Sequence, residues 1–343
     1  MRSILANLLC EDELARRTPS RETLRTVSGL ATLLRVFARE GDRLWTPAPV
    51  DPGRVLPVPG LPMPILESDI GDTIEPSDAL LAWCETPKAA ALRKLPREPS
   101  SSLPLHELLW HLPVPQPSVV AKVHHRAFHL QVAEELDCVL PGARMVESMA
   151  ELDRILASAP ASWVVKAPFS ASGRSRYIER KGPRFPDEKA RRTVERLFEL
   201  HGPLLFESWM DRTADFGCSA LLTESGLKVI GFHRQMVDIK GQFAGIELPV
   251  EVPDWMETVE GVAGALRRAG YVGPFGIDAW THRKDGKLVL NPLGEINARM
   301  TFGLVAWALA ERLGIERMRL RFGPEAPPGA IPLLEGGAWI ETA

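Results

Sequence analysis

The chain has 343 residues, of which 45% are hydrophobic and 25% are charged, and its formal net charge is −3. This is the composition of an ordinary soluble globular protein of two or three domains. The arginines alternate with acids and no apolar run approaches the ~18 residues of a membrane span, so we expect neither nucleic acid nor a membrane as a partner.

The cysteines indicate the compartment. Cys10, Cys84, Cys138 and Cys218 are far apart and show neither a CxxC motif nor a zinc spacing. Such scattered cysteines are typical of reduced core thiols in a cytoplasmic protein. The first residues turn acidic after a short apolar stretch, which argues against a signal peptide. We therefore expect a cytoplasmic protein.

The first 95 residues are expected to alternate strands with helices. A strand is expected at Ile4–Leu9, an amphipathic helix at about Arg21–Arg39 that Gly41 ends, and another strand at Asp78–Trp83. This alternation predicts a small α/β layer.

Two proline-rich stretches interrupt the chain. Trp45–Pro64 is expected to form an extended loop, whereas Pro96–Pro117 also contains Ser100–Ser102 and is the better linker candidate. We therefore expect an N-terminal α/β domain at residues 1–112 that includes this linker.

A lysine strand and a loop of small residues follow. Trp163–Pro168 is an apolar strand interrupted by Lys166, and Ser170–Ser175 leads to a return strand at Arg176–Arg180. Backbone N–H groups of such a loop can approach phosphate oxygens, and Lys166 adds a positive charge. The loop is not a Walker A motif, because no GxxxxGK[ST] is present and a strand follows it. An ordinary hairpin would show the same pattern.

Lysine is scarce in this chain, with only ten among 41 basic residues, so a lysine within an apolar strand stands out. A second lysine, Lys122, precedes the helical pattern Arg126–Leu136. By itself Lys122 also fits a solvated residue at a helix start.

The remaining elements follow from caps and periodicity. A strand is expected at Pro203–Asp211, before a hairpin through Ser225-Gly226. Helices are expected at Asp187–His201, which Gly202 ends, at Asp254–Gly270 with an aspartate cap, and at Phe302–Leu313.

The segment Gly273–Gly303 carries the strongest chemical pattern. Asp285-Gly286 predicts a hairpin turn, which in an ideal register puts Asp278 opposite Leu293. Because side chains alternate, Glu295, Asn297 and Arg299 then share the face of Asp278, with Glu295 a diagonal neighbour at roughly 5–8 Å. Pro292 cannot donate to the ladder, so the register carries an error of about one residue.

Two carboxylates and an amide at that spacing can hold one or two Mg²⁺ ions through oxygen ligands. The alternative is a solvated hairpin whose charged face meets water. Ile277, Leu290 and Ile296 make these strands resemble core, where acidic residues seldom occur without a partner or a metal.

This Asp followed by E-x-N-x-R resembles the metal-binding end of the ATP-grasp superfamily, and the lysine helix, lysine strand and hinge occur upstream in the order of that family. The resemblance covers residues 113–325. It implies an α/β (α+β) fold of two lobes that clasp ATP, at residues 113–205 and 206–343, behind a small Rossmann-like domain.

The resemblance also implies roles for single residues. It assigns ATP contacts to two lysines, to the small-residue loop, to a hinge strand and to an acid after that strand, and the loop would act as a mobile lid. These residues are Lys122, Lys166, Ser170, Ser172, Gly173, Arg174, Glu207, Trp209, Met210 and Asp215. In most members the last of these is a glutamate. The metal ligands would be Asp278, Glu295 and Asn297, holding Mg²⁺ or Mn²⁺.

The activity implied is ligation of a carboxylate to an amine through an acylphosphate, with release of ADP and phosphate. Arg299 and Arg234 would bind the phosphoryl group or a carboxylate through paired N–H donors, and His233 could assist proton removal or be purely structural. The substrates would be a small-molecule or peptide carboxylate and an amine, and a homodimer is allowed. A phosphotransferase and a non-catalytic nucleotide-binding protein remain the alternatives.

Overall fold

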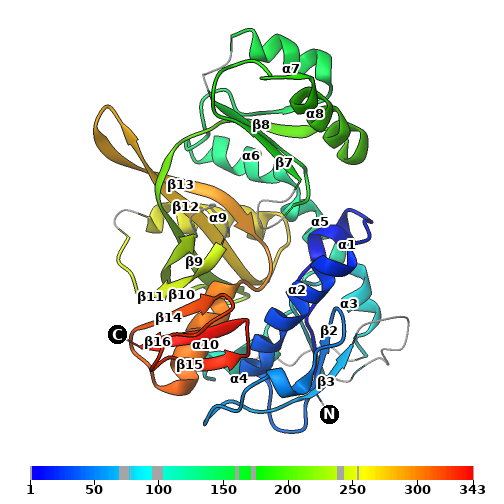
Figure 1. Cartoon of the computed structure of the whole chain (residues 1–343), viewed down its shortest axis with the longest axis vertical. Coiled ribbons are helices and arrows are strands. Elements are labelled where there is room, and N and C mark those ends of the chain that lie inside the picture. The colour runs from blue at the N-terminus through cyan, green and yellow to red at the C-terminus, as the bar shows by residue number, and fades with distance from the viewer. Residues whose placement is uncertain are drawn as a thin grey trace.

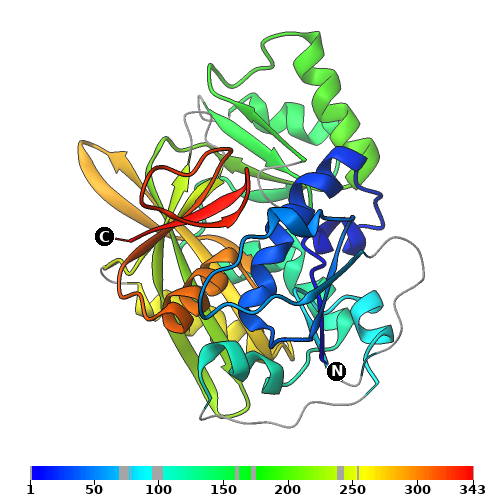
Figure 2. The ribbon, with the colours of Figure 1, turned by 60° about the horizontal axis from the view of Figure 1, so that its bottom comes forward.

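A computed structural model describes residues 2–68, 77, 79–94, 103–158, 162–170, 175–237, 243–252 and 255–342. Its strands form two four-stranded sheets and one eight-stranded sheet (Figure 1). One small sheet stands apart at the top of the view with α7 and α8, whereas the N-terminal layer and the large sheet pack against each other below. Figure 2, turned about the horizontal axis, shows the same division. None of the described helices is long and apolar enough to cross a membrane.

The N-terminal sheet is parallel, with the order β3-β2-β1-β4. Its strands are β1 (Arg2–Leu5), β2 (Arg43–Thr46), β3 (Ile65–Ser68) and β4 (Ala79–Ala82). Its helical segments are α1 (Cys10–Leu14), α2 (Arg21–Ala31), η1 (Thr32–Phe37), η2 (Pro52–Arg54) and α3 (Pro87–Ala91). Parallel strands bring their carboxyl ends to one edge, so the residues that follow β1 and β4 lie together.

The second small sheet is antiparallel, with the order β5-β8-β6-β7. Its strands are β5 (Arg144–Val146), β6 (Trp163–Lys166), β7 (Arg176–Glu179) and β8 (Leu204–Ser208), and its helices are α7 (Met149–Leu156) and α8 (Glu188–His201). Trp163, Val165 and Phe206 are buried between this sheet and the two helices. Before the sheet come α4 (Leu105–Leu108), η3 (Leu109–His111), α5 (Pro117–His124) and α6 (Arg126–Glu135).

The large sheet has the order β13-β12-β9-β10-β11-β14-β16-β15. Its strands are β9 (Arg212–Thr223), β10 (Gly226–Val237), β11 (Phe243–Leu248), β12 (Gly273–Lys284), β13 (Lys287–Asn297), β14 (Met318–Phe322), β15 (Ile331–Leu334) and β16 (Ala338–Thr342). The helices α9 (Met256–Arg268) and α10 (Phe302–Leu313) pack on it.

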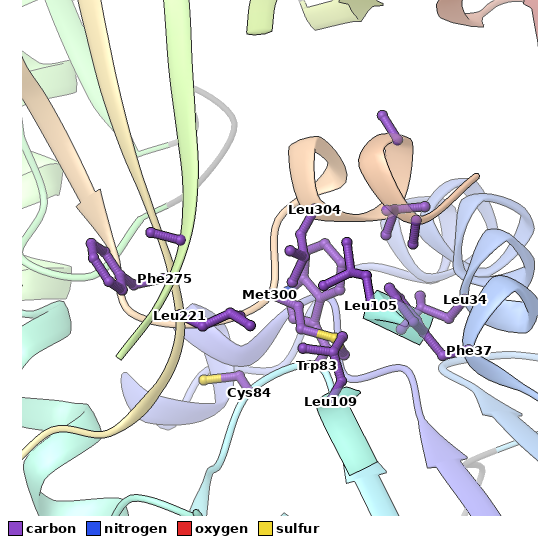
Figure 3. Packing of buried hydrophobic residues seen from close by; sticks show 14 of the residues in the cluster. Leu34, Phe37, Trp83, Cys84, Leu105, Leu109, Leu221, Phe275, Met300 and Leu304 are labelled. Atoms are coloured by element: carbon purple, nitrogen blue, oxygen red, sulfur yellow. The ribbon is translucent and has the colours of Figure 1, made fainter. Parts of the chain in front are cut away.

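One apolar core joins the N-terminal layer to the large sheet. Figure 3 shows Leu34 and Phe37 of η1 near Leu105 and Leu109, with Trp83, Met300 and Leu304 beside them. Backbone bonds reinforce this contact, since Met300 N donates to Trp83 O at 3.0 Å. The N-terminal layer is therefore packed directly against the strand end that carries the E-x-N-x-R sequence.

Most predicted elements are present with shifted ends. The first strand ends at Leu5 and α1 begins at Cys10, so the strand expected at Ile4–Leu9 is wrong after Leu5. The long helix ends as an α-helix at Ala31 and continues as a 3₁₀ helix to Phe37. There the Thr32 hydroxyl donates to Gly29 O at 2.7 Å, a side-chain bond that competes with helical pairing.

The helix after Asp187 is confirmed, since the Asp187 side chain accepts from Ala190 N and Gly202 ends it with a φ of 71°. Two calls, Asp78 as a strand start and Asp254 as a cap, lie outside the described residues. The predicted domain boundary after residue 112 stays a prediction. The one after residue 205 also stays a prediction, and β8 spans that position and pairs with β5 and β6.

Candidate active site

The two predicted metal-binding carboxylates face each other across adjacent strands. Asp278 on β12 pairs directly with Glu295 on β13, whereas the ideal register had put Leu293 there. The register prediction was therefore off by two residues, not one. Trp280 pairs with Asn291, so β13 holds extra residues between the two pairs. Because the shift is an even number, the side chains predicted to share a face still do so.

Gly294 makes this bulge sterically feasible. A Cβ atom at that position would lie 2.1 Å from Trp280 Cζ3 and 3.0 Å from the Asp278 carbonyl oxygen. The Trp280 ring thus fills the space beside the bulge, which lets the extra residues pass without separating the strands. The bulge turns a diagonal neighbour into a direct partner and so brings Glu295 closer to Asp278.

Amide groups surround Asp278. Gln235 Nε2 donates to Asp278 Oδ1 at 2.6 Å, and Asn297 Nδ2 donates to Asp278 Oδ2 at 3.2 Å. Burial, followed by the charge of Glu295, raises the pKa of Asp278 to about 7 even though these amides oppose the shift. Two carboxylates this close repel each other when both are ionised, and a divalent metal would relieve that repulsion. These oxygen donors therefore fit a hard cation such as Mg²⁺.

Arg299 continues the row from Asn297. Its Nη2 donates to Asn297 Oδ1 at 3.0 Å, and its Nε donates to Glu11 Oε1 of the N-terminal layer at 2.7 Å. Burial raises the pKa of Glu11, but the charges of Arg299 and His124 outweigh it and lower that pKa to about 2. Arg299 is thus held charged and in place by a residue 288 positions away.

His233 lies in a tight slot beside the carboxylates. It is cross-strand from Gly217, which in turn pairs with Asp278, and a Cβ on Gly217 or Gly303 would come within 2.2 Å of its ring. Burial lowers the pKa of His233 to about 4, so the ring is neutral at pH 7. Within the described chain its Nδ1 has no hydrogen-bond partner.

The polar side chains lie at one cavity of about 140 Å³. It is lined by His233, Gln235, Asp278, Glu295, Asn297 and Arg299, together with Cys218, Phe243, Ile246, Gly276, Thr301, Phe302 and Gly303. Arg234 is not among them. Neighbouring strand residues point to opposite faces, and Arg234, between His233 and Gln235, is exposed on the far face. The structure therefore separates Arg234 from the other residues expected to act on the substrate.

Lys166 lies at the end of β6 in the antiparallel four-stranded sheet, where it is buried and ion-paired with Glu207 on β8. Burial lowers the pKa of Lys166, and the charge of Glu207 opposes that shift. Burial raises the pKa of Glu207, but Lys166 and then His129 outweigh it and lower the pKa. Glu207, expected at the adenine hinge, thus holds the side chain of the strand lysine.

Arg126 connects this sheet to the metal strand. Its Nε donates to Ala167 O at 3.1 Å, and its Nη2 contacts Ser170 Oγ and Glu295 Oε1, both at 3.2 Å. The guanidinium is buried, with 8% of its side chain exposed. It binds the start of the small-residue loop and the predicted metal ligand Glu295 at once.

Lys122 is not at this position. It lies in α5, which ends at His124, and its side chain is exposed. Because α6 begins at Arg126, the basic residue at that helix start is Arg126, and the chain supplies an arginine where a lysine was predicted. The loop residues Ser172, Gly173 and Arg174 lie outside the described residues.

The sequence has no match among protein-family models or curated proteins. Solved structures do match. The N5-carboxyaminoimidazole synthetase of Staphylococcus aureus, complexed with ADP, aligns over 99% of this chain and 92% of its own, with a TM-score of 0.61 and 9% identity. The N5-carboxyaminoimidazole ribonucleotide synthetase of Thermus thermophilus aligns over 100% and 94%, at 0.57 and 14%. The ATP complex of the synthase from Aspergillus clavatus gives 100% and 93%, at 0.53 and 12%.

The chain has the ATP-grasp fold. All three similar proteins are covered over nearly their whole length, so the likeness includes the N-terminal layer and the two antiparallel sheets. The fold prediction is confirmed, and the identities are too low to show more than the fold.

In this fold β8 leads to a stack of arginines and tryptophans. Trp209 follows β8 and is half-buried, and Arg180 and Arg212 lie 5.2 Å and 5.8 Å from its ring centroid. Arg212 also lies 4.1 Å from the ring centroid of Trp280, and its Nη1 donates to Asp215 Oδ1 at 2.9 Å. Such contacts hold the arginine by cation–π attraction and an ion pair. Met210 is half-buried beside Trp209.

Sequence reasoning missed four residues of this site. Arg126 and Arg212 showed no motif, because arginines are common throughout the chain. Gln235 could have been found from alternation on β10, since it shares the face of His233. Glu11 had no local signal at all.

Proposed function

We propose that this protein is an ATP- and Mg²⁺-dependent ligase that activates a carboxylate as an acylphosphate and joins it to an amine, releasing ADP and phosphate. The observation that carries the proposal is the direct pairing of Asp278 with Glu295, beside Asn297, at one cavity. The buried Arg126 links Glu295 to the end of the lysine strand, where the expected phosphate loop begins. The similar proteins of Staphylococcus aureus and Aspergillus clavatus were solved with ADP and with ATP. Their fold and this site together favour nucleotide chemistry.

Asp278, Glu295 and Asn297 would hold Mg²⁺ or Mn²⁺, which supplies positive charge to the phosphates of ATP. A cation would relieve the repulsion between the paired carboxylates, which contributes to the raised pKa of Asp278. Lys166, fixed by Glu207, and Arg126, fixed by Ala167 O, are the basic groups nearest to the loop that begins at Ser170. We assign the ATP phosphates to them.

The remaining calls are also proposals. Trp209 and Met210 follow the hinge strand and would border the adenine, and Asp215, held by Arg212, would contact the ribose. Ser170, Ser172, Gly173 and Arg174 would cover the phosphates. Lys122 and Arg234 are exposed and outside the cavity, so we assign them no contact.

Arg299 would position the reacting groups. Because Glu11 and Asn297 hold its Nε and Nη2, it keeps one orientation at the edge of the cavity before any substrate arrives. Preorganised charge of this kind stabilises the negative charge that develops during phosphoryl transfer. Neutral His233 lines the same cavity and could accept the proton that the attacking amine loses.

The test is amine-dependent formation of ADP. The purified protein is incubated with Mg²⁺-ATP and a metabolite extract or candidate acids, with and without amines, and ADP and new products are measured by mass spectrometry. We expect an amide product and ADP release that requires both substrates. ADP release with a phosphorylated product and no need for an amine would show a phosphotransferase instead. The absence of any nucleotide turnover across acids and amines would favour the non-catalytic alternative.

Matched variants connect this activity to the site. We expect Asp278→Asn and Glu295→Gln to keep the fold and lose ADP formation. Asp285→Asn removes an exposed acid at the turn of the same hairpin and should keep it. Equal activity of all three variants at saturating Mg²⁺ would contradict the assignment of Asp278 and Glu295 as metal ligands.

A further inference from the structure

Two buried thiols lie together at the carboxyl edge of the N-terminal sheet. Cys10 follows β1 and Cys84 follows β4, and the two side chains lie close enough for each to shift the pKa of the other. Cys84 Sγ also lies 3.8 Å from His124 Nε2. The Asn7 side chain fixes the Cys84 backbone, since it accepts from Cys84 N at 3.1 Å and donates to Cys84 O at 2.9 Å.

The surroundings make the two thiols chemically different. Burial raises the pKa of Cys84, but the hydrogen bond with Cys10 and the charge of His124 outweigh it and lower that pKa to about 7. Burial raises the pKa of Cys10 well above its usual value. Cys84 is therefore the more acidic thiol of the pair and Cys10 the one that holds its proton, which is the arrangement of an attacking and a resolving cysteine.

The other two cysteines provide an internal contrast. Burial raises the pKa of Cys138 to about 11 and of Cys218 to about 12. Within the described part of the chain, neither side chain forms a hydrogen bond with an imidazole or a second thiol. Both should remain unreactive thiols under mild oxidation.

A small cavity reaches Cys84. It has a volume of about 20 Å³, and its lining includes Trp83, Glu85, Arg299 and Tyr271. A space of this size holds about one water molecule. It suits a molecule as small as hydrogen peroxide and excludes bulky thiol reagents. Figure 3 shows the Cys84 sulfur directed away from the apolar group formed by Trp83, Met300 and Leu109.

We propose that Cys10 and Cys84 form a peroxide-reactive dithiol, a modification site that converts to an internal disulfide. The Cys84 thiolate attacks one oxygen of hydrogen peroxide, the O–O bond breaks, and hydroxide leaves a sulfenic acid on Cys84. The Cys10 sulfur then attacks the Cys84 sulfur, the S–O bond breaks, and water leaves with the Cys10 proton. The two sulfurs lose two electrons in total, and the peroxide is reduced to water and hydroxide.

The dithiol is connected to the candidate active site. Glu11 directly follows Cys10 and accepts from Arg299 Nε at 2.7 Å, and Arg299 in turn holds Asn297 at 3.0 Å. Drawing Cys10 to covalent distance from Cys84 shifts the segment that carries Glu11. Oxidation should therefore lower ligase activity reversibly, a consequence that rests on the proposed function.

Disulfide mapping tests the modification independently of turnover. The folded protein is treated with hydrogen peroxide, unfolded, alkylated and digested, and its peptides are identified by mass spectrometry. We expect a Cys10–Cys84 disulfide that dithiothreitol removes, while Cys138 and Cys218 become alkylated. Cys138→Ser is the matched control and should give the same disulfide at the wild-type rate.

Two variants separate the steps. Cys10→Ser should stop at a Cys84 sulfenic acid that dimedone traps, because the resolving thiol is gone. His124→Gln should slow peroxide consumption at least tenfold at pH 7, because loss of the His124 charge raises the pKa of Cys84 and leaves less thiolate. Complete alkylation of Cys84 after peroxide treatment, or oxidation of Cys138 at the same rate, would overturn the proposal. Because the mapping needs no substrate, its result is readable even if the ligase assignment fails.

Discussion

Replacing Lys166 by methionine separates its structural role from its expected nucleotide contact. Lys166 and Glu207 form an ion pair inside the antiparallel four-stranded sheet, and their side chains are only 10% and 6% exposed. Removing the ammonium leaves a buried carboxylate without its main partner. Breaking a buried pair in this way costs about 3–5 kcal/mol. Arg126 also stabilises the charged form of Glu207, so we expect about 3 kcal/mol, the lower end of that range.

The double variant Lys166→Met/Glu207→Gln should recover most of the lost free energy of unfolding, because no uncompensated charge stays buried. It should still bind ATP more weakly, by about 1–3 kcal/mol, because the charge-assisted phosphate contact is absent. Urea denaturation measures the first quantity, and calorimetric titration with a non-hydrolysable ATP analogue measures the second. Glu207→Gln alone is the control, since it keeps the lysine.

The opposite binding result would refute the reasoning. If the double variant binds the analogue as tightly as the wild-type protein, Lys166 serves only to neutralise Glu207. The phosphate contact would then have to be assigned to Arg126 alone.

Three further perturbations test the site and its support. In the folded protein Asp278 keeps its proton up to a pKa of about 7, whereas in the unfolded chain this carboxyl loses it near 3.8. The free energy of unfolding of the metal-free protein should therefore fall as pH rises between these values. Asp278→Asn should flatten that fall in urea titrations, and an unchanged slope would exclude Asp278 as its source. Leu109→Ala, in the core between the N-terminal layer and α10, should cost about 2–5 kcal/mol in the same assay. Gly294→Ala should lower Mn²⁺ affinity by moving Trp280 and the bulge, and normal affinity would show that the bulge is not needed.

The sequence was most informative where local chemistry is decisive. Asp285 and Gly286 have φ values of 52° and 76°, as a tight turn requires, and the strands on either side pair as expected. From that turn, alternation placed Asp278, Glu295 and Asn297 on one face. The caps at Asp187 and Gly202 fixed a helix in the same way.

The remaining features depend on contacts that leave no local pattern. The bulge before Glu295 requires the Trp280 ring against Gly294, which only the folded packing shows. Glu11 holds Arg299 across 288 residues, and Arg126 holds Glu295 across 169. A charged residue in a single sequence carries no mark of its distant partner, so these clamps could not be predicted.

Binding of a metal–nucleotide complex tests the central claim most directly. Mn²⁺ is titrated into the protein in the presence of ADP and followed by electron paramagnetic resonance, which reports the bound ion without any substrate. We predict one or two Mn²⁺ ions bound by the wild-type protein and by Asp285→Asn, and at least a tenfold loss of affinity in Asp278→Asn and Glu295→Gln. Equal affinity in all four proteins would contradict the account, because the paired carboxylates would then not be the metal site.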